Sequence, residues 1–243
     1  MIQDFEAKDW DQIWCRIVKN HFASQTIRNV SYVVGNPPWV RWSRLPRSYR
    51  ARCKSFCNYY GLVSGRGYAG GIESDISTVI LYSSVDHWLR TGGKLAFLIT
   101  ATVCKSDSAA GFRKFRLPNG MPIVPLTIDD MVSLQPFPDA SNETSLILAQ
   151  KAGSAASRRR YRIPYILWTR SDGKAGIRPW MTLRQVLNVT ERDELRAEPI
   201  NGHGSPFFTG TRADAVAIRP FKGSSPYYLE RSHKGTTTDC SPV

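Results

Sequence analysis

The sequence lacks any apolar run near the about 18 residues that a membrane-spanning helix needs. Its first twenty residues include four acidic side chains, which is unlike a secretory or mitochondrial targeting segment. It has only five cysteines, scattered and odd in number, which favours a reducing compartment over a disulfide framework. Cys53 and Cys57 stand one helical turn apart without a second Cys or His pair, so we expect two half-buried thiols and no metal site. These features predict a cytoplasmic protein with no membrane partner.

Acidic side chains are scarce relative to basic ones. The 243 residues include 33 Lys and Arg against 20 Asp and Glu, a formal net charge of +13. An excess of this size favours a polyanionic partner such as a nucleic acid, although it says nothing about the fold. With 42% hydrophobic residues the chain can still bury a core and is unlike a disordered tail.

Strand-like and helix-like segments alternate over the first 150 residues, which predicts an α/β fold with a mainly parallel sheet and helices on both faces. Short β-branched or alternating runs predict strands at 30–35, 94–100, 126–134 and 145–150. Apolar stripes predict helices at 4–22, 75–90 and 107–116, the second of them ended by Gly92 and Gly93. The last two strands are close enough in sequence to form an antiparallel pair at an edge of the sheet.

The composition changes after residue 152. Residues 153–162 are small and polar and then basic, which is typical of a linker, and their arginines indicate a basic linker or a DNA clamp equally. Beyond them, residues 161–168 predict a strand and 181–197 a short helix, before a stretch rich in Gly, Ser, Pro and Thr. We therefore expect one unit over residues 1–152 and a basic extension over residues 163–243.

The most specific pattern is Asn36-Pro37-Pro38-Trp39, which directly follows the expected strand 30–35. Ligands of open α/β sheets bind at the carboxyl ends of the strands, where this loop is expected. Two prolines fix the backbone and remove two N–H donors, which leaves the Asn36 side-chain oxygen and the Pro37 carbonyl as acceptors. They suit a planar amino group with two hydrogens to donate, and Trp39 offers an aromatic face to a ring.

A strand followed by NPP and an aromatic residue resembles the catalytic motif of S-adenosylmethionine-dependent amino-methyltransferases. The wording YVVGNPPWVRW is most similar to the adenine-N6 DNA methyltransferases of restriction-modification and phage-defence systems. The similarity continues in order through Glu73-Ser-Asp75, GGKLAFLIT, Gln135–Ala140 and TSLILAQK, over roughly residues 30–152. It implies a Rossmann-like methyltransferase sheet and methyl transfer to the N6 amino group of adenine in double-stranded DNA.

The resemblance also implies roles for individual residues. Asn36 and the Pro37 carbonyl would accept the two N6 hydrogens within the catalytic loop that Pro38 completes, and Asn36 and Pro37 would also contact the cofactor. Trp39 would stack on an adenine flipped out of the duplex, and Phe137 would hold the other side of that ring. For Phe137, an ordinary place in the core is the alternative.

The family's Gly-rich cofactor loop normally precedes the NPP motif, and none of the 35 residues before Asn36 resembles it. Gly65-Arg-Gly-Tyr-Ala-Gly70 matches G-x-G-x-x-G, but it follows no expected strand and opens no expected helix, so we expect a loop without cofactor contacts. The chain therefore resembles the C-terminal half of a catalytic domain with the start of a target-recognition region: a split subunit, a truncated gene product or a fragment. A companion polypeptide could then supply the cofactor-binding half.

Acidic residues are absent from positions 41–54, where six basic side chains occur. Directly beyond the expected base loop, Arg41, Arg44, Arg47 and Arg50 are candidates for DNA phosphate contacts, with a solvated helix face as the alternative. Two other functions stay open. One is methylation of a protein glutamine, which uses a similar NPP loop but has less use for the arginines; the other is a non-catalytic DNA-binding or assembly subunit.

Overall fold

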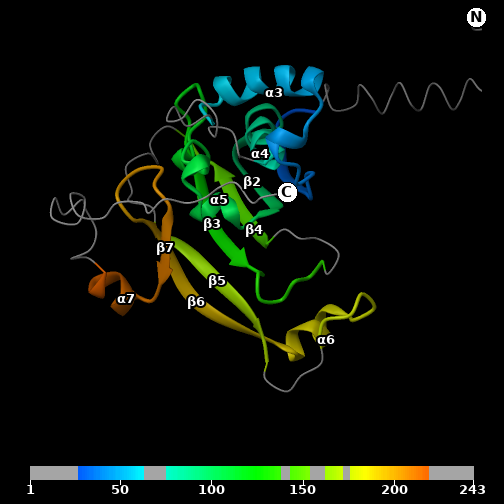
Figure 1. The fold of residues 1–243 in the computed structure, drawn as a ribbon, viewed down its shortest axis with the longest axis vertical. Helices are drawn as coiled ribbons and strands as arrows, with labels where there is room; N and C mark the ends of the chain where they lie inside the picture. The colour runs from blue at the N-terminus through cyan, green and yellow to red at the C-terminus, as the bar shows by residue number, and fades with distance from the viewer. Residues whose placement is uncertain (1–26, 63–74, 138–142, 154–161, 172–175, 219–243) are drawn as a thin grey trace, which may run out of the picture.

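The computed structural model describes residues 27–62, 75–137, 143–153, 162–171 and 176–218. Its centre is a seven-stranded sheet with the strand order β1-β2-β4-β3-β5-β6-β7 (Figure 1). The strands are β1 Val30–Gly35, β2 Leu89–Thr100, β3 Ile123–Asp130, β4 Thr144–Lys151, β5 Ile163–Arg170, β6 Thr190–Pro199 and β7 Phe207–Gly210. The helices are α3 Arg47–Tyr59, α4 Ile76–His87, α5 Thr102–Lys105, α6 Leu183–Asn188 and α7 Arg212–Ala217, with 3₁₀ turns η1 Trp42–Arg44, η2 Asp107–Ala109 and η3 Phe112–Lys114. The α/β class predicted from the sequence is confirmed, but the prediction of a mainly parallel sheet is wrong, because two strand pairings of the described sheet are parallel and four are antiparallel.

Strand direction determines which loops share an edge of the sheet. β1 pairs with β2 in parallel, and so does β3 with β5, whereas β4 lies antiparallel between β2 and β3. β6 is antiparallel to both β5 and β7. Consequently β1, β2, β3 and β5 all run in one direction, and the loops that follow them leave the same edge.

The elements around the NPP motif form where the sequence predicts them, for local reasons. β1 matches the run VSYVVG, whose β-branched residues favour a strand, and Pro37 ends it because proline cannot donate to a ladder. α4 begins at Ile76 because the Asp75 side chain accepts a hydrogen bond from the Ser77 N–H at 3.2 Å, a typical N-cap. β2 and β4 contain the predicted strands 94–100 and 145–150.

Three predicted helix boundaries are wrong, and the predicted helix 4–22 lies outside the described residues. α4 ends at His87, and Gly92 and Gly93 lie inside β2. Residues 107–116 form two 3₁₀ turns, because Gly111 packs against the backbone of residues 61–62 and Phe115 adopts a left-handed φ of 46°. Residues 181–197 are divided between α6 and β6, since β6 pairs with eight residues of β5.

The antiparallel pair of β3 and β4 is present, but it does not lie at an edge of the sheet. β5, β6 and β7 extend the same sheet beyond β3, so the residues after the expected linker contribute to it. Arg113 also ties this extension to the rest of the chain. Its fully buried guanidinium donates to the carbonyl oxygens of Gly204 and Ser205, at 3.1 and 2.9 Å, and to that of Val103 at 2.6 Å.

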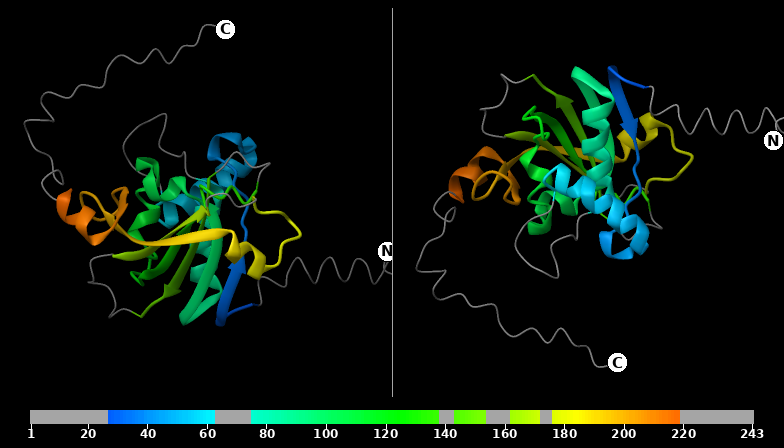
Figure 2. Two further views of the ribbon diagram at one scale, coloured as in Figure 1. Left: turned by 90° about the horizontal axis from the view of Figure 1, so that it is seen from below. Right: turned by 90° about the horizontal axis from the view of Figure 1, so that it is seen from above.

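The hydrophobic core lies between the sheet and a layer that contains α3, α4 and the segment 102–114 (Figure 2). α4 and that segment meet directly, because the Tyr82 hydroxyl donates to the Phe112 carbonyl oxygen at 2.6 Å. Cys53 and Cys57 of α3 are buried rather than half-buried, and burial raises the pKa of both thiols, that of Cys57 to about 11. On the other face of the sheet, Tyr32 and Val34 of β1 are exposed. No helix in the described part of the chain is long and apolar enough to cross a membrane.

Candidate functional site

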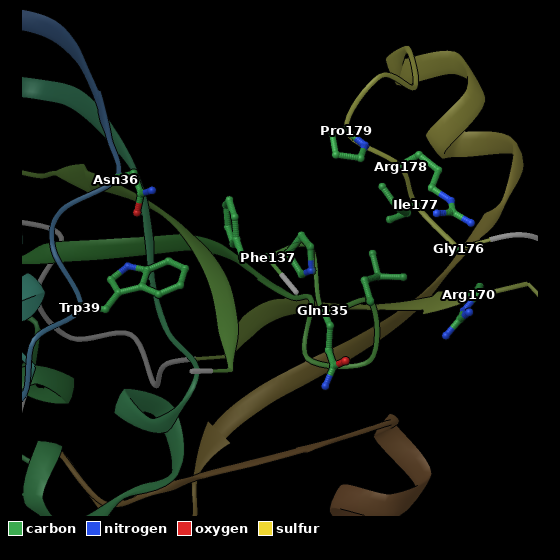
Figure 3. Close-up of a pocket in the computed structure, with 11 residues that line it drawn as sticks. Asn36, Trp39, Gln135, Phe137, Arg170, Gly176, Ile177, Arg178 and Pro179 are labelled. Atoms are coloured by element: carbon green, nitrogen blue, oxygen red, sulfur yellow. The ribbon is translucent and has the colours of Figure 1, made fainter. Parts of the chain in front are cut away.

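A cavity of about 800 Å³ lies at the edge where the loops after β1, β3 and β5 leave the sheet (Figure 3). Pockets of this size hold small molecules or single nucleotides. The lining comes from the NPP loop, from the segment after β3, and from the end of β5 with the segment that follows it: Asn36, Trp39, Leu134, Gln135, Pro136, Phe137, Arg170, Gly176, Ile177, Arg178 and Pro179. The position agrees with the rule that ligands bind at the carboxyl ends of parallel strands.

The NPP loop is held at both ends. At its start, β1 approaches β2 so closely that a Cβ on Gly35 would lie 2.9 Å from a ring carbon of Phe97. At its exit, the Ile76 N–H donates to the Val40 carbonyl oxygen at 3.1 Å, and Arg41 forms a β-bridge with Asp75. The start of α4 thereby fixes the backbone that follows Trp39.

Asn36 and Trp39 line the cavity, whereas Pro37 is buried and Pro38 is exposed outside its lining. Trp39 is half-buried, and its indole N–H donates to the Leu98 carbonyl oxygen at 3.2 Å, which orients the ring. The Asn36 side chain is exposed and lies on the same side of the cavity as Trp39 (Figure 3). An amide and an aromatic ring from one short loop are therefore available to a ligand in this cavity.

Trp39 and Phe137 contact each other edge to face, with ring centroids 5.6 Å apart and planes at 75°. Phe137 is 39% exposed, so it is not the ordinary core residue that was the alternative interpretation. A ring held flat between two aromatics needs about 7 Å between parallel planes. Holding a base between these two residues would consequently require Phe137 to turn away from Trp39.

The segment that carries Phe137 is shaped by Asp130 at the end of β3. This buried carboxyl accepts a hydrogen bond from the Tyr165 hydroxyl of β5 and another from the Val132 N–H, the latter at 2.9 Å. Burial raises the pKa of Tyr165, and the hydrogen bond to Asp130 raises it further. Downstream, Gln135 adopts a left-handed φ of 44°. The position of Phe137 thus depends on a hydrogen bond between β3 and β5.

The far wall of the cavity consists of residues that the sequence did not identify. Arg170 ends β5, and Ile177, Arg178 and Pro179 follow it (Figure 3). In the described part of the chain, neither arginine forms an ion pair. A signal for Arg170 existed, since it lies two residues after the predicted strand 161–168, and a parallel strand there would end at the ligand-binding edge.

The four arginines proposed from the sequence for DNA contacts do not line this cavity. Arg41, Arg44 and Arg47 are exposed on the segment from the NPP loop into α3, and Arg50 is half-buried. Arg44, Arg47 and Arg50 have no ion-pair partner among the described residues. Of the linker arginines, Arg162 lies 3.8 Å from the Glu198 carboxylate, whereas Arg158, Arg159 and Arg160 are outside the described residues.

The described lining does not fit S-adenosylmethionine as its cofactor. That molecule presents a sulfonium cation and ribose hydroxyls, which a carboxylate would suit. Within the described residues, the cavity offers Arg170 and Arg178 and no carboxylate. The segment Gly65–Gly70 lies outside the described residues.

No protein-family model and no curated protein matches this sequence. Similar solved structures include a nuclease-deletion mutant of the Type ISP restriction-modification enzyme LlaGI in complex with a DNA substrate mimic, with 14% identity over 78% of this chain and 16% of that chain, and a TM-score of 0.47. The Type ISP restriction-modification enzyme LlaBIII bound to DNA has 11% identity over 74% and 13% of the two chains, with a TM-score of 0.45. The DrdV–DNA complex has 16% identity over 75% and 18%, with a TM-score of 0.43. The chain spans less than a fifth of each of these proteins, and similarities this distant do not assign a function.

Proposed function

We propose that this chain forms the base-binding part of a DNA methyltransferase that transfers a methyl group from S-adenosylmethionine to the N6 amino group of adenine. The observation that carries the proposal is that Asn36 and Trp39 of the NPP loop line one cavity at the carboxyl edge of the sheet with Phe137, which is far from them in sequence. An amide acceptor beside aromatic rings suits a planar base that bears an amino group. The cofactor-binding half is proposed to come from groups outside this lining, such as a companion polypeptide.

The proposed role of the NPP loop is to prepare the amino nitrogen for attack. The Asn36 side-chain oxygen accepts one N6 hydrogen and the Pro37 carbonyl accepts the other, so the nitrogen lone pair leaves conjugation with the ring. In the complete enzyme that nitrogen would bond to the methyl carbon as the sulfur–methyl bond of S-adenosylmethionine breaks. The sulfur would keep the electron pair of that bond, and the nitrogen would lose one proton to water. Because positive charge develops on the nitrogen, both acceptors stabilise the transition state more than the bound base.

One feature of the cavity favours this proposal over methylation of a protein glutamine, and another favours a non-catalytic subunit. Arg170 and Arg178 at the far wall suit a ligand that carries phosphates, whereas a protein glutamine has no use for them. A non-catalytic DNA-binding subunit is the second candidate, favoured by the absence of a carboxylate from the described cavity lining. The proposed methyltransferase and the non-catalytic subunit both predict DNA binding, so only a measurement of methyl transfer distinguishes them.

The test measures methyl transfer to duplex DNA by the chain reconstituted or fused with a cofactor-binding half. Asn36→Ala removes one acceptor, and we expect turnover to fall by about 10²–10³ while DNA affinity changes little. Asn58→Ala, which removes an exposed asparagine from α3 outside the cavity, is the matched control and should keep full turnover. Full turnover in Asn36→Ala would overturn the mechanism, and no transfer by the reconstituted wild type would favour the non-catalytic subunit.

Trp39→Ala should behave differently from Asn36→Ala. Stacking on an aromatic ring holds the base before reaction as well as during it, and it is worth roughly 1–3 kcal/mol per base. Affinity and turnover should therefore both fall. A fluorescent base analogue at the target position reports base flipping independently of methyl transfer, and flipping unchanged in Trp39→Ala would rule out the stacking role.

A further inference from the structure

The segment between β5 and β6 exposes large apolar side chains to solvent. We call residues 176–188 the β5–β6 arm; it contains α6 and lies at the outer end of the β5–β6 pair (Figure 1). Trp180 is 76% exposed and Leu183 is 73% exposed, although both side chains are large and apolar. Exposed apolar groups this close together indicate a binding surface.

The arm is continuous with the cavity. Ile177, Arg178 and Pro179 line the far wall, and Trp180 is the next residue of the chain. The Arg178 guanidinium lies 5.9 Å from the centroid of the Trp180 ring, which holds the cation and the aromatic face together. A ligand that fills the cavity and extends past Arg178 would meet this ring next.

The charge of the arm favours an anionic partner. The described residues of the arm and of the end of β5 contain the basic side chains Arg170, Arg178 and Arg184, and residues 170–171 and 176–190 contain no acidic side chain. Arg170 and Arg178 are exposed and form no ion pair within the described residues. Exposed arginines beside an aromatic ring are the combination that binds unpaired nucleic acid, through phosphate contacts and base stacking.

We propose that the β5–β6 arm and the end of β5 form a DNA-binding element in which Arg170 and Arg178 contact phosphates next to the nucleotide in the cavity and Trp180 stacks on a neighbouring unpaired base. The proposal rests on the proposed function in taking the cavity occupant to be a nucleotide of a DNA duplex. It adds a specific consequence. The arm would favour duplexes in which a base is already unpaired, because Trp180 then needs no base pair to open.

The experiment measures the affinity of the full chain for two labelled duplexes by fluorescence anisotropy. One duplex is fully paired, and the other carries a mismatched adenine with a second mismatch beside it, so that one base can enter the cavity while its neighbour is unpaired. Trp180→Ala removes the stacking face and Trp180→Phe keeps one. Tyr32→Ala is the matched control, because it removes an aromatic of similar exposure, 73%, from β1. Arg178→Gln tests the phosphate contact through the dependence of affinity on salt.

We expect the wild type to prefer the mismatched duplex. Trp180→Ala should weaken binding to that duplex by about 5- to 100-fold, whereas Trp180→Phe and Tyr32→Ala should bind nearly as the wild type does. Arg178→Gln should lower the slope of log affinity against log salt concentration by about 0.9. Because methyl transfer is not measured, an inactive enzyme would contradict the proposed function and leave this result intact.

Three results would overturn the proposal. One is the absence of DNA binding by the wild type, and another is equal affinity of wild type and Trp180→Ala for the mismatched duplex. The third is equal loss in Trp180→Ala and Tyr32→Ala. If Trp180→Ala instead disrupts assembly with a companion protein and leaves DNA affinity unchanged, the arm is a protein-binding surface and the assignment to DNA is wrong.

Discussion

The hydrogen bond from Tyr165 to Asp130 should stabilise the chain more than an ordinary buried hydroxyl does. Tyr165→Phe deletes one oxygen and leaves the ring in place, so packing is kept while the buried Asp130 carboxyl loses a donor. Hydrogen bonds to charged groups contribute about 1.5–3 kcal/mol. We expect the free energy of unfolding to fall by an amount in that range.

Tyr82→Phe provides the comparison within the same molecule. The Tyr82 hydroxyl is also buried, but it donates to the neutral carbonyl oxygen of Phe112 at 2.6 Å. A neutral hydrogen bond contributes about 0.5–1.5 kcal/mol. Urea unfolding monitored by circular dichroism measures the free energy of unfolding of both variants. An unchanged m-value shows that the variants differ from the wild type in stability alone.

A double-mutant cycle then isolates the pair. Asp130→Asn keeps an oxygen for the Val132 N–H and removes the charge that Tyr165 contacts. Tyr165→Phe and Asp130→Asn should couple by about 0.5–3 kcal/mol, since contacting residues are not additive. Additive effects, or a cost for Tyr82→Phe as large as that for Tyr165→Phe, would refute the argument.

Four further outcomes test three separate features. Replacing Arg44 and Arg47 with Ala should reduce the slope of log DNA affinity against log salt concentration by about 0.9 for each phosphate contact that is lost. An unchanged slope would mean that these arginines lie on a solvent-exposed helix face and do not contact DNA. Asp75→Ala should cost about 0.5–2 kcal/mol of stability through the lost N-cap, whereas Asp75→Asn keeps a cap. Burial raises the pKa of Asp75, so folding favours its protonated form. The stability of the wild type relative to Asp75→Asn should therefore fall as pH rises from about 3.8 through the raised pKa. Urea unfolding at several pH values measures this difference. Calorimetry of the isolated chain with S-adenosylmethionine should detect weak binding or none. Micromolar affinity would contradict the conclusion that the described cavity lining does not fit this cofactor.

The strands beside the NPP motif could be predicted from the sequence because their signals are local. A β-branched run bounded by proline, as at Val30–Gly35, has few alternatives, and an Asp75 N-cap defines the start of α4. The predicted helix at 107–116 failed because its conformation depends on a distant contact. Gly111 packs against the backbone of residues 61–62, and no pattern within ten residues reports that.

The candidate site was predictable on one wall only. Asn36 and Trp39 follow a recognisable strand, and Phe137 lay in a segment that a family resemblance singled out. Arg170 and Arg178 were missed because their place depends on β5 running parallel to β3 within the same sheet. The composition of residues 153–162 predicts a linker before β5 and thereby assigns β5 to a separate unit.

The most direct test of the central claim identifies which atom receives the methyl group. The chain, reconstituted with a cofactor-binding half, is incubated with duplex DNA and S-adenosylmethionine carrying a labelled methyl group, and the DNA is digested to nucleosides for mass spectrometry. We expect the label in N6-methyladenine, and its loss in Asn36→Ala. Label in a methylated cytosine, or in a glutamine of an added protein with none in the DNA, would contradict it.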